Sequence, residues 1–317
     1  MMNKIRVSIQ WLSNQSIPKL RIKLLRPLLM KRYTDYCSED FIASLEKVGI
    51  CSGDSVFLMC SQDKIYLKTG KILPTQLLLK DLIHYLGQDG TLMTLCFPLD
   101  RENILKKNKI FNAKKTPTEC GIFAEILRRK RGSIRSLNPI FSVISYGKKA
   151  QEFSNDHHQS PYPFGSMSPY YKLMTDGGKY LGIGVGFEAF TPCHMIEDYF
   201  KDKFKHKIYY DFPQEFRVIC PDEIEKSIIT YTRNPSTFPR GGYDPLYYFN
   251  LLNIKSHQTL TQSGIKLFTF TIKDFFDAAI SIYDTRQITV WDTGSLKFLV
   301  SKKIKNLVRP LLKPHLS

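Results

Sequence analysis

"GDSVFLMCS" at residues 53–61 and "GTLMTLCF" at residues 90–97 are two short apolar runs, each opened by a glycine. Between them, "PTQLLLKDLIHYLG" at residues 74–87 places apolar side chains at helical spacing and ends on a glycine. A strand that is apolar on both faces is typical of a sheet that is covered by helices. The stretch therefore predicts a strand, a helix and a second strand in an α/β fold.

Alternating helices and strands continue on both sides of this unit. Before it, "SEDFIASLEKVGI" predicts a helix with Ser38 as its N-cap and a glycine at its end. After it, the chain predicts a helix at 121–130, a strand at 141–147, a proline-rich loop at 157–169 and a strand at 179–186. The segment "TPCHMIEDYF" at residues 191–200 follows that last strand and contains a histidine three residues before a glutamate.

Composition excludes several classes of protein. A chain of 317 residues with 43% hydrophobic and 13% aromatic residues is typical of a globular protein, and it has no apolar run of 18 residues that would predict a transmembrane helix. The basic N-terminus lacks an apolar stretch followed by a cleavage site, which argues against a secretory signal. The seven cysteines contain no CxxC pair, so we expect reduced thiols in a cytoplasmic protein rather than disulfides or a zinc site.

The formal net charge of +17 is concentrated at the two ends of the chain. Residues 1–35 contain eight lysines and arginines and one aspartate, and residues 295–317 contain six basic residues and no acidic one. We therefore divide the chain into a basic N-terminal arm (1–35), a central domain (36–294) and a basic amphipathic C-terminal tail (295–317). Nucleic-acid binding is disfavoured, because no aromatic stacking motif accompanies the charge.

Both arms interleave basic residues with leucines, as in "KLRIKLLRPLLMKR" (19–32) and "SLKFLVSKKIKNLVRPLLKP" (295–314). Two readings are open. The tail is either a terminal helix packed on the protein body with a solvated basic face, or a helix that lies with the N-terminal arm on an anionic membrane surface. The second reading predicts a peripheral protein at the cytoplasmic face of a membrane.

Seven motifs in order resemble the aminoglycoside 3-N-acetyltransferase family, which includes amino-sugar N-acyltransferases. They are "GDSVFLMCS", "LGQDGTLMTLCF", "TPTECGIFAEILRR", "RSLNPIFSVISYGKKA", "FGSMSPYYKL", "YLGIGVGFEAFTPCHMIED" and "FFDAAISIYDTRQITVW". The resemblance implies a three-layer α/β/α sandwich with a central mixed sheet. It also implies acyl-CoA, such as acetyl-CoA, as a co-substrate, an amine acceptor and no permanently bound cofactor.

The family's Thr-x-x-His-x-x-Glu setting matches this chain at His194 and Glu197. The resemblance implies that His194 is the base for the acceptor amine. This chemistry needs a residue of that type, because an ammonium ion has no lone pair for attack on a thioester and imidazole can accept its proton near neutral pH. No metal is predicted, since the His-x-x-Glu pair offers two ligands and no third ligand follows at a suitable spacing.

The chain departs from the family pattern at four positions, one of which is Cys60, where the family has the first of two paired serines after the first strand. Acids that usually partner the histidine are replaced by Arg233 and Pro235, and the histidine of an R-S-x-H-P motif is replaced by Asn138. A histidine base without a carboxylate partner loses control of its tautomer and stabilisation of its imidazolium form. Glu197, Asp198 and Asp211 are all candidates for that partner.

Relatives place the turn after the first strand against the coenzyme. The resemblance therefore implies coenzyme contacts at Cys60 and Ser61, and further contacts from two later motifs at Arg135, Ser136, Ser166 and Ser168. Ordinary loop polarity is an equal explanation for the last four. A covalent role for Cys60 is disfavoured, because no base lies beside it in sequence to lower its pKa.

The sequence thus predicts an enzyme, a CoA-dependent N-acyltransferase that acts on an amino sugar. The near-neutral central region favours a neutral or anionic acceptor, such as a nucleotide- or lipid-linked amino sugar in surface-polysaccharide synthesis. Two alternatives remain: an aminoglycoside 3-N-acetyltransferase of antibiotic resistance, and a catalytically weakened relative that binds CoA or a sugar.

Overall fold

A computed structural model describes residues 36–99, 101, 104–105, 109–237 and 244–294. The two predicted basic arms, 1–35 and 295–317, lie outside the described residues. Among the described helices, none is long and apolar enough to cross a membrane.

The central sheet has seven strands in the order β4-β5-β2-β1-β6-β10-β9. Strand β1 (Ser55–Cys60) lies in the middle and pairs in parallel with β2 (Thr91–Leu95) and with β6 (Lys179–Ile183). The outer strands pair in antiparallel orientation; they are β4 (Ile134–Arg135), β5 (Val143–Gly147), β9 (Gln258–Gln262) and β10 (Ile265–Thr271). The predicted mixed sheet is therefore confirmed, as is the strand–helix–strand unit.

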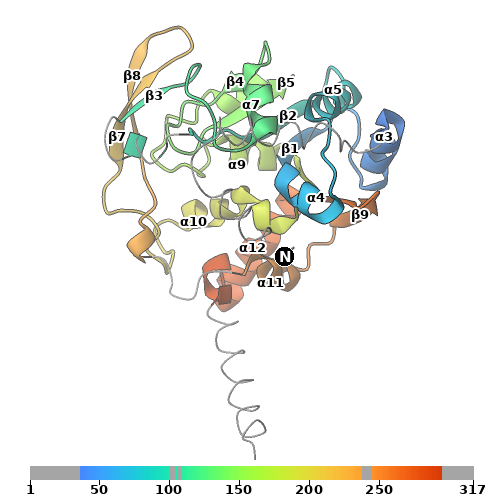
Figure 1. Cartoon of the computed structure of the whole chain (residues 1–317). Coiled ribbons are helices and arrows are strands. Elements are labelled where there is room, and N and C mark those ends of the chain that lie inside the picture. The colour runs from blue at the N-terminus through green and yellow to red at the C-terminus, as the bar shows by residue number, and fades with distance from the viewer. Residues whose placement is uncertain (1–35, 100, 102–103, 106–108, 238–243, 295–317) are drawn as a thin grey trace, which may run out of the picture.

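Helices cover both faces of this sheet and complete the three predicted layers (Figure 1). Val56 and Leu58 of β1 belong to one buried cluster and Phe57 to another, as the alternation of side chains along a strand requires. The first cluster contains side chains from α3 (Ser38–Lys47), α4 (Gln62–Thr69), α5 (Thr75–Leu86) and α7 (Ile122–Arg129). The second contains side chains from α8 (Ala150–Ser154), α9 (Pro169–Thr175), α10 (Met195–Tyr199), α11 (Pro245–Leu252) and α12 (Ile272–Arg286).

The predicted cap of the first described helix is wrong by one residue. Helix α3 begins at Ser38, and Cys37 occupies the N-cap; its side chain bonds to the Glu39 carboxylate and accepts no capping hydrogen bond from a helix N–H. The Ser38 hydroxyl instead donates to Asp81 Oδ2 on α5 at 2.6 Å, and the Tyr36 hydroxyl donates to the same oxygen at 2.8 Å. The Ser38 hydroxyl thus bonds to a carboxylate on the neighbouring helix and does not cap its own helix.

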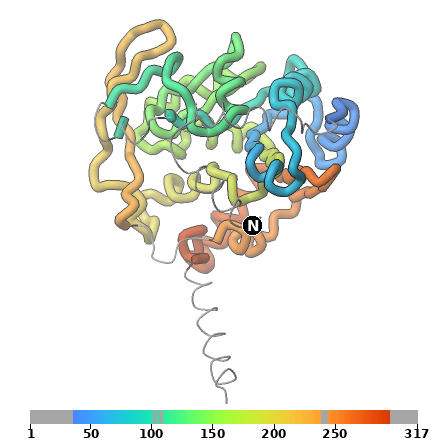
Figure 2. Tube along the Cα trace, in the orientation of Figure 1, coloured from blue at the N-terminus to red at the C-terminus, as the bar shows by residue number. Residues whose placement is uncertain are grey.

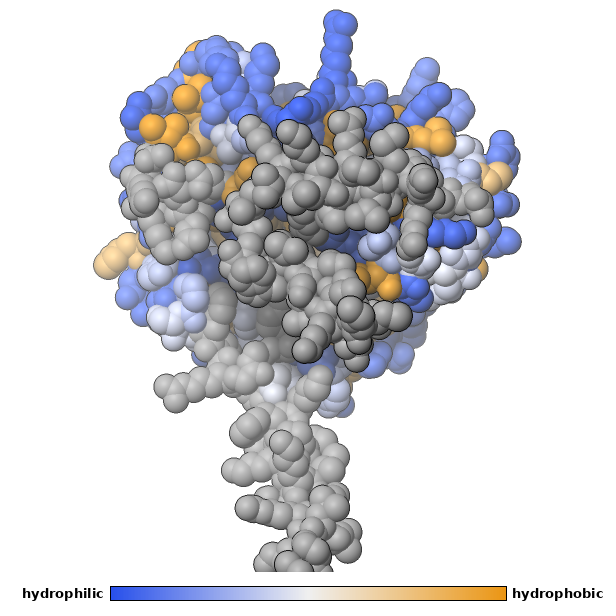
Figure 3. Space-filling view, in the orientation of Figure 1, coloured by the Kyte–Doolittle hydropathy of each residue, from blue (hydrophilic) through white to orange (hydrophobic). Residues whose placement is uncertain are grey.

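A second, three-stranded sheet lies beside the main body. Strand β7 (Gln214–Ile219) pairs in parallel with β3 (Ile110–Asn112) and in antiparallel orientation with β8 (Glu225–Thr230). Figure 3 shows apolar side chains at the upper left of the visible face, over this sheet. Two isoleucines of the β7–β8 hairpin, Ile224 and Ile229, are more than half exposed. The sheet brings the segment after β8 toward the segment that contains His194.

Asn138 joins this second sheet to the turn before β5. Its side chain is fully buried; Nδ2 donates to Thr230 Oγ1 at 3.0 Å, and Oδ1 accepts hydrogen bonds from the backbone N–H groups of Ile140 and Phe141. The replacement of the family's histidine by Asn138 therefore occurs at a position where, in this chain, the side chain has a structural role.

We expect Asn138→Ala to lower the free energy of unfolding by about 3 kcal/mol, because it leaves buried donors and an acceptor without partners. Chemical denaturation of both proteins measures this difference. Asn155→Ala is the matched control, since Asn155 is exposed and, within the described residues, its side chain bonds to the exposed Gln151 alone; we expect a change within about 0.5 kcal/mol. A loss below about 1 kcal/mol for Asn138→Ala would contradict the structural role.

Candidate functional site

A tight turn leads from the central sheet to His194. Strand β6 ends at Ile183, and Gly184 follows with a φ of +72°. A Cβ atom at Gly184 would lie 2.4 Å from Cγ1 of Ile65 on α4, so glycine is required both by the backbone and by the close packing. A 3₁₀ turn over Thr191–His194 then runs directly into α10.

His194 and Glu197 form a hydrogen-bonded pair. Their i, i+3 spacing places both side chains on one face of the turn, with His194 Nδ1 2.6 Å from Glu197 Oε1. The carboxylate accepts at Nδ1, so it favours the tautomer that keeps the lone pair on Nε2. The Nε2 atom has no hydrogen-bond partner in the described part of the chain, and the His194 side chain is 17% exposed. The imidazole can therefore accept a proton from a molecule that reaches it.

Two distant segments complete the surroundings of Glu197. Trp291 Nε1 donates to Glu197 Oε1 at 2.6 Å, and Arg233 Nη2 donates to Glu197 Oε2 at 2.8 Å. The Glu197 side chain is only 3% exposed, and the Trp291 ring also stacks near His194 with 5.8 Å between ring centroids. The yellow, orange and red parts of the tube approach one another in the lower half of Figure 2. A buried carboxylate with three donors is fixed in position, and so is the imidazole that it holds.

Burial and charge set the protonation states of this cluster. Burial alone would raise the pKa of Glu197, but the Arg233 charge and the contact with His194 lower that pKa to about 2. Burial and the Arg233 charge lower the pKa of His194, against the opposing effect of Glu197. Glu197 is therefore charged and His194 neutral at neutral pH, which is the state that a general base requires.

Asp198, the second candidate partner, bonds to groups other than the imidazole. It accepts hydrogen bonds from the backbone N–H of Phe164 and from the Tyr209 hydroxyl, both at 2.7 Å. Burial raises the pKa of Asp198 to about 7, although these bonds lower it in part. The residue thus attaches α10 to the loop before α9 and to the segment before β7.

Asp211, the third candidate, is exposed and forms an ion pair with Lys207. Glu197 is therefore the carboxylate that contacts His194. Pro235 begins a short 3₁₀ helix, whereas Arg233, at the position of a missing family acid, reaches Glu197. Sequence reasoning missed this contact and that of Trp291; the only signal was the unusual arginine itself.

The turn after β1 lies beside the turn that precedes His194. The backbone N–H of Ser61 donates to the carbonyl of Ile183 at 3.2 Å, and the Ser61 hydroxyl caps α4 by accepting from the Lys64 N–H. Lys64 Nζ in turn lies 2.8 Å from Glu188 Oε1. Burial raises the pKa of the neighbouring Cys60 thiol to about 12, so the thiol stays protonated near neutral pH and a covalent role has no support.

The other four expected coenzyme residues differ in accessibility. Arg135 is buried and donates to two backbone carbonyls, and Ser136 is buried against His157 Nδ1 at 2.8 Å. Ser168 is buried and caps α9, whereas Ser166 is exposed. The structure thus gives Arg135, Ser136 and Ser168 partners inside the chain, and leaves Ser166 facing solvent.

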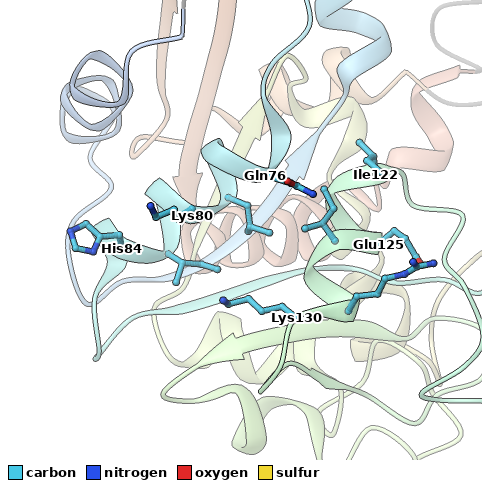
Figure 4. Close-up of a pocket in the computed structure, with 10 residues that line it drawn as sticks. Gln76, Lys80, His84, Ile122, Glu125 and Lys130 are labelled. Carbon is cyan, nitrogen blue, oxygen red and sulfur yellow. The ribbon is translucent and has the colours of Figure 1, made fainter. Parts of the chain in front are cut away.

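A groove of about 810 Å³ lies elsewhere, between α5 and α7. Figure 4 shows Gln76, Lys80 and His84 on one side of it and Ile122, Glu125 and Lys130 on the other. These helices belong to the layer opposite α10, and the groove contains no residue of the His194 cluster. Within the described residues, no three His, Cys, Asp or Glu side chains come together as a metal site.

Comparisons with known proteins agree with this fold. The family model for aminoglycoside 3-N-acetyltransferase matches residues 67–242. Aminoglycoside N(3)-acetyltransferase IX of Micromonospora chalcea is 25% identical over 184 residues, which are 53% of this chain and 64% of that protein. The chain spans less than two thirds of the length of the curated relatives that it matches.

Solved structures share the fold at low sequence identity. AAC-IIIb in a binary complex with CoASH is 18% identical with a TM-score of 0.64, over 79% of this chain and 97% of that one. AAC-VIa bound to sisomicin is also 18% identical, with a TM-score of 0.63 over 80% and 99% of the two chains. Because the family model covers more than half of the sequence, the chain belongs to the aminoglycoside 3-N-acetyltransferase family.

Proposed function

We propose that this protein is an acyl-CoA-dependent N-acetyltransferase that acts on an amine of an aminoglycoside-type amino sugar. One observation carries the proposal: His194 holds Nδ1 against the buried carboxylate of Glu197 and leaves Nε2 without a partner among the described residues. Relatives crystallised with CoASH and with sisomicin support the two substrate classes.

In the proposed reaction, His194 Nε2 accepts the proton that the acceptor nitrogen loses as it bonds to the thioester carbon. Glu197 keeps the ring oriented and stabilises the positive charge that forms on it. The carbon–sulfur bond then breaks, and the proton passes from His194 to the departing thiolate of CoA. The amide and free CoASH are the products, and the histidine returns to its neutral state.

The coenzyme would lie at the carboxyl ends of β1 and β6. These strands are parallel neighbours, and the chain leaves β1 toward β2 on the opposite side, so the two ends form a switch point of the kind where α/β sheets bind ligands. The start of α4 at Ser61 offers backbone N–H groups and a hydroxyl there, which suit a phosphate or a thioester oxygen. Ser166 is the accessible candidate on the later loop.

A second candidate acceptor is a neutral or anionic amino sugar that is linked to a nucleotide or a lipid. The observation that favours it is the ion pair of Arg233 with Glu197, which leaves the proposed base without a net negative charge beside it to attract a polycation. The basic arms would then attract the protein to an anionic membrane surface that contains a lipid-linked acceptor.

Turnover of an acceptor panel with acetyl-CoA, measured by thiol release, distinguishes these acceptors. We expect aminoglycosides to be acetylated with a kcat/KM at least about ten times that of nucleotide-linked amino sugars, or of lipid-linked ones in anionic vesicles. A tenfold difference corresponds to about 1.4 kcal/mol of transition-state binding. Preference for the nucleotide- or lipid-linked sugars would reverse the choice of acceptor. Binding of CoA without thiol release from any amine would indicate the catalytically weakened relative.

A further inference from the structure

The cation behind the His194–Glu197 pair is held in one orientation. Arg233 Nη2 donates to Glu197 Oε2 at 2.8 Å, and the Arg233 side chain is 15% exposed. Its Cζ atom lies 5.6–6.0 Å from four ring centroids, those of Phe141, Phe164, Tyr209 and Trp291. Its Nη1 atom is buried with no hydrogen-bond partner among the described residues, so the rings and one carboxylate hold the guanidinium.

This arrangement changes the net charge of the catalytic pair. A histidine–glutamate pair alone is negative before it accepts a proton and neutral afterwards. With Arg233 bound to Glu197, the cluster is neutral before proton transfer and positive afterwards. Because the cluster is largely buried, that extra positive charge is costly to form.

We propose that Arg233 is a positioning residue, which fixes Glu197 for its contact with His194 and holds the imidazole in its neutral, proton-accepting form under mildly acidic conditions. The proposal rests on the proposed function, in which His194 is the base. It differs from the family pattern, in which acids occupy this part of the sequence.

Most of the other titratable groups around the imidazole carry no charge that would alter the protonation of His194 as the Arg233 charge does. Burial raises the pKa values of the Cys193 thiol and the Tyr209 hydroxyl, so both stay neutral. Asp198 is the exception, because its pKa of about 7 lies in the range where histidine titrates. Removal of the Asp198 charge must therefore accompany the test.

The decisive comparison is Arg233→Met against Arg233→Lys in the full-length protein, each alone and with Asp198→Asn. We expect the methionine variant to move the acidic limb of the kcat/KM–pH profile upward by about one unit, because a nearby positive charge has been removed. The lysine variant keeps the charge and should leave the limb within about 0.3 units of the wild type. Arg217→Met removes an exposed arginine that pairs with Glu225, and it should leave the acidic limb of the kcat/KM–pH profile unchanged.

Histidine NMR titration gives a second readout that does not depend on activity, with the His194 signal assigned by its loss in His194→Asn. Equal His194 titration midpoints in the wild type and the methionine variant would overturn the proposal. If the methionine variant does not stay folded, Arg233→Gln, which removes the charge but keeps a donor for Glu197, takes its place. Failure of the wild type to release thiol with any amine would refute the proposed function alone, since the titration would still report on Arg233.

Discussion

His194→Ala is expected to lower the kcat of acyl transfer by about 100- to 10,000-fold, the usual contribution of a positioned general base. The imidazole is the only group of the described cluster with a free basic nitrogen at neutral pH. Glu197 is occupied by three donors, and Asp198 faces a backbone N–H and a tyrosine hydroxyl. The acceptor amine would have to lose its proton to water in the variant.

Affinity for CoA should remain within about threefold of the wild type, because His194 acts on the acceptor rather than on the coenzyme. Steady-state kinetics and calorimetric titration with CoA separate the two effects. His84→Ala is a matched control, since His84 is an exposed histidine on α5 in the opposite helical layer. Unchanged turnover in His194→Ala would show that His194 is not the general base.

Local patterns were sufficient to predict the middle of the fold. The apolar runs at 53–61 and 90–97 became β1 and β2, because burial on both faces leaves a simple signature in the sequence. Helix α4 was not predicted; it is short, its only fully buried apolar side chain is Ile65, and its start depends on the Ser61 cap. The second sheet was also missed, because β3 and β7 are separated by about a hundred residues and pair only in the folded chain.

The candidate site could likewise be predicted only where its residues are close in sequence. His194 and Glu197 are three residues apart, so their contact could be predicted from helical spacing. Arg233 and Trp291 lie 36 and 94 residues from Glu197, and no periodicity relates them to it. Sequence comparison flagged Arg233 as a missing acid, whereas the fold shows it as a third partner of the same carboxylate.

Glu197→Gln should reduce both stability and activity strongly. The glutamine side chain keeps the shape of glutamate but leaves the Arg233 charge buried without a counter-ion, and its amide NH₂ group, which is a donor, replaces one of the two oxygens that accept from the three donors. We expect the free energy of unfolding to fall by about 3–5 kcal/mol, as when one partner of a buried ion pair is removed. We also expect kcat to fall by about 100- to 10,000-fold, because the imidazole loses control of its tautomer and its charge partner.

The stability loss should depend on pH in a defined direction. The pKa of Glu197 is lowered to about 2 in the folded protein, against about 4.3 in an unfolded chain, so its contribution is complete at neutral pH and is lost as pH falls between about 5 and 2. The difference between wild type and Glu197→Gln should therefore shrink over that range in denaturation experiments.

Two further variants separate the charge from the hydrogen bonds. Glu197→Gln combined with Arg233→Met removes the unpaired cation, so we expect it to recover most of the lost stability but none of the activity. Glu225→Gln is the surface counterpart, since Glu225 pairs with Arg217 at 2.7 Å while both side chains are exposed; its cost should stay below about 1 kcal/mol. A double variant as unstable as Glu197→Gln alone would show that the loss comes from the histidine and tryptophan contacts instead of the buried charge.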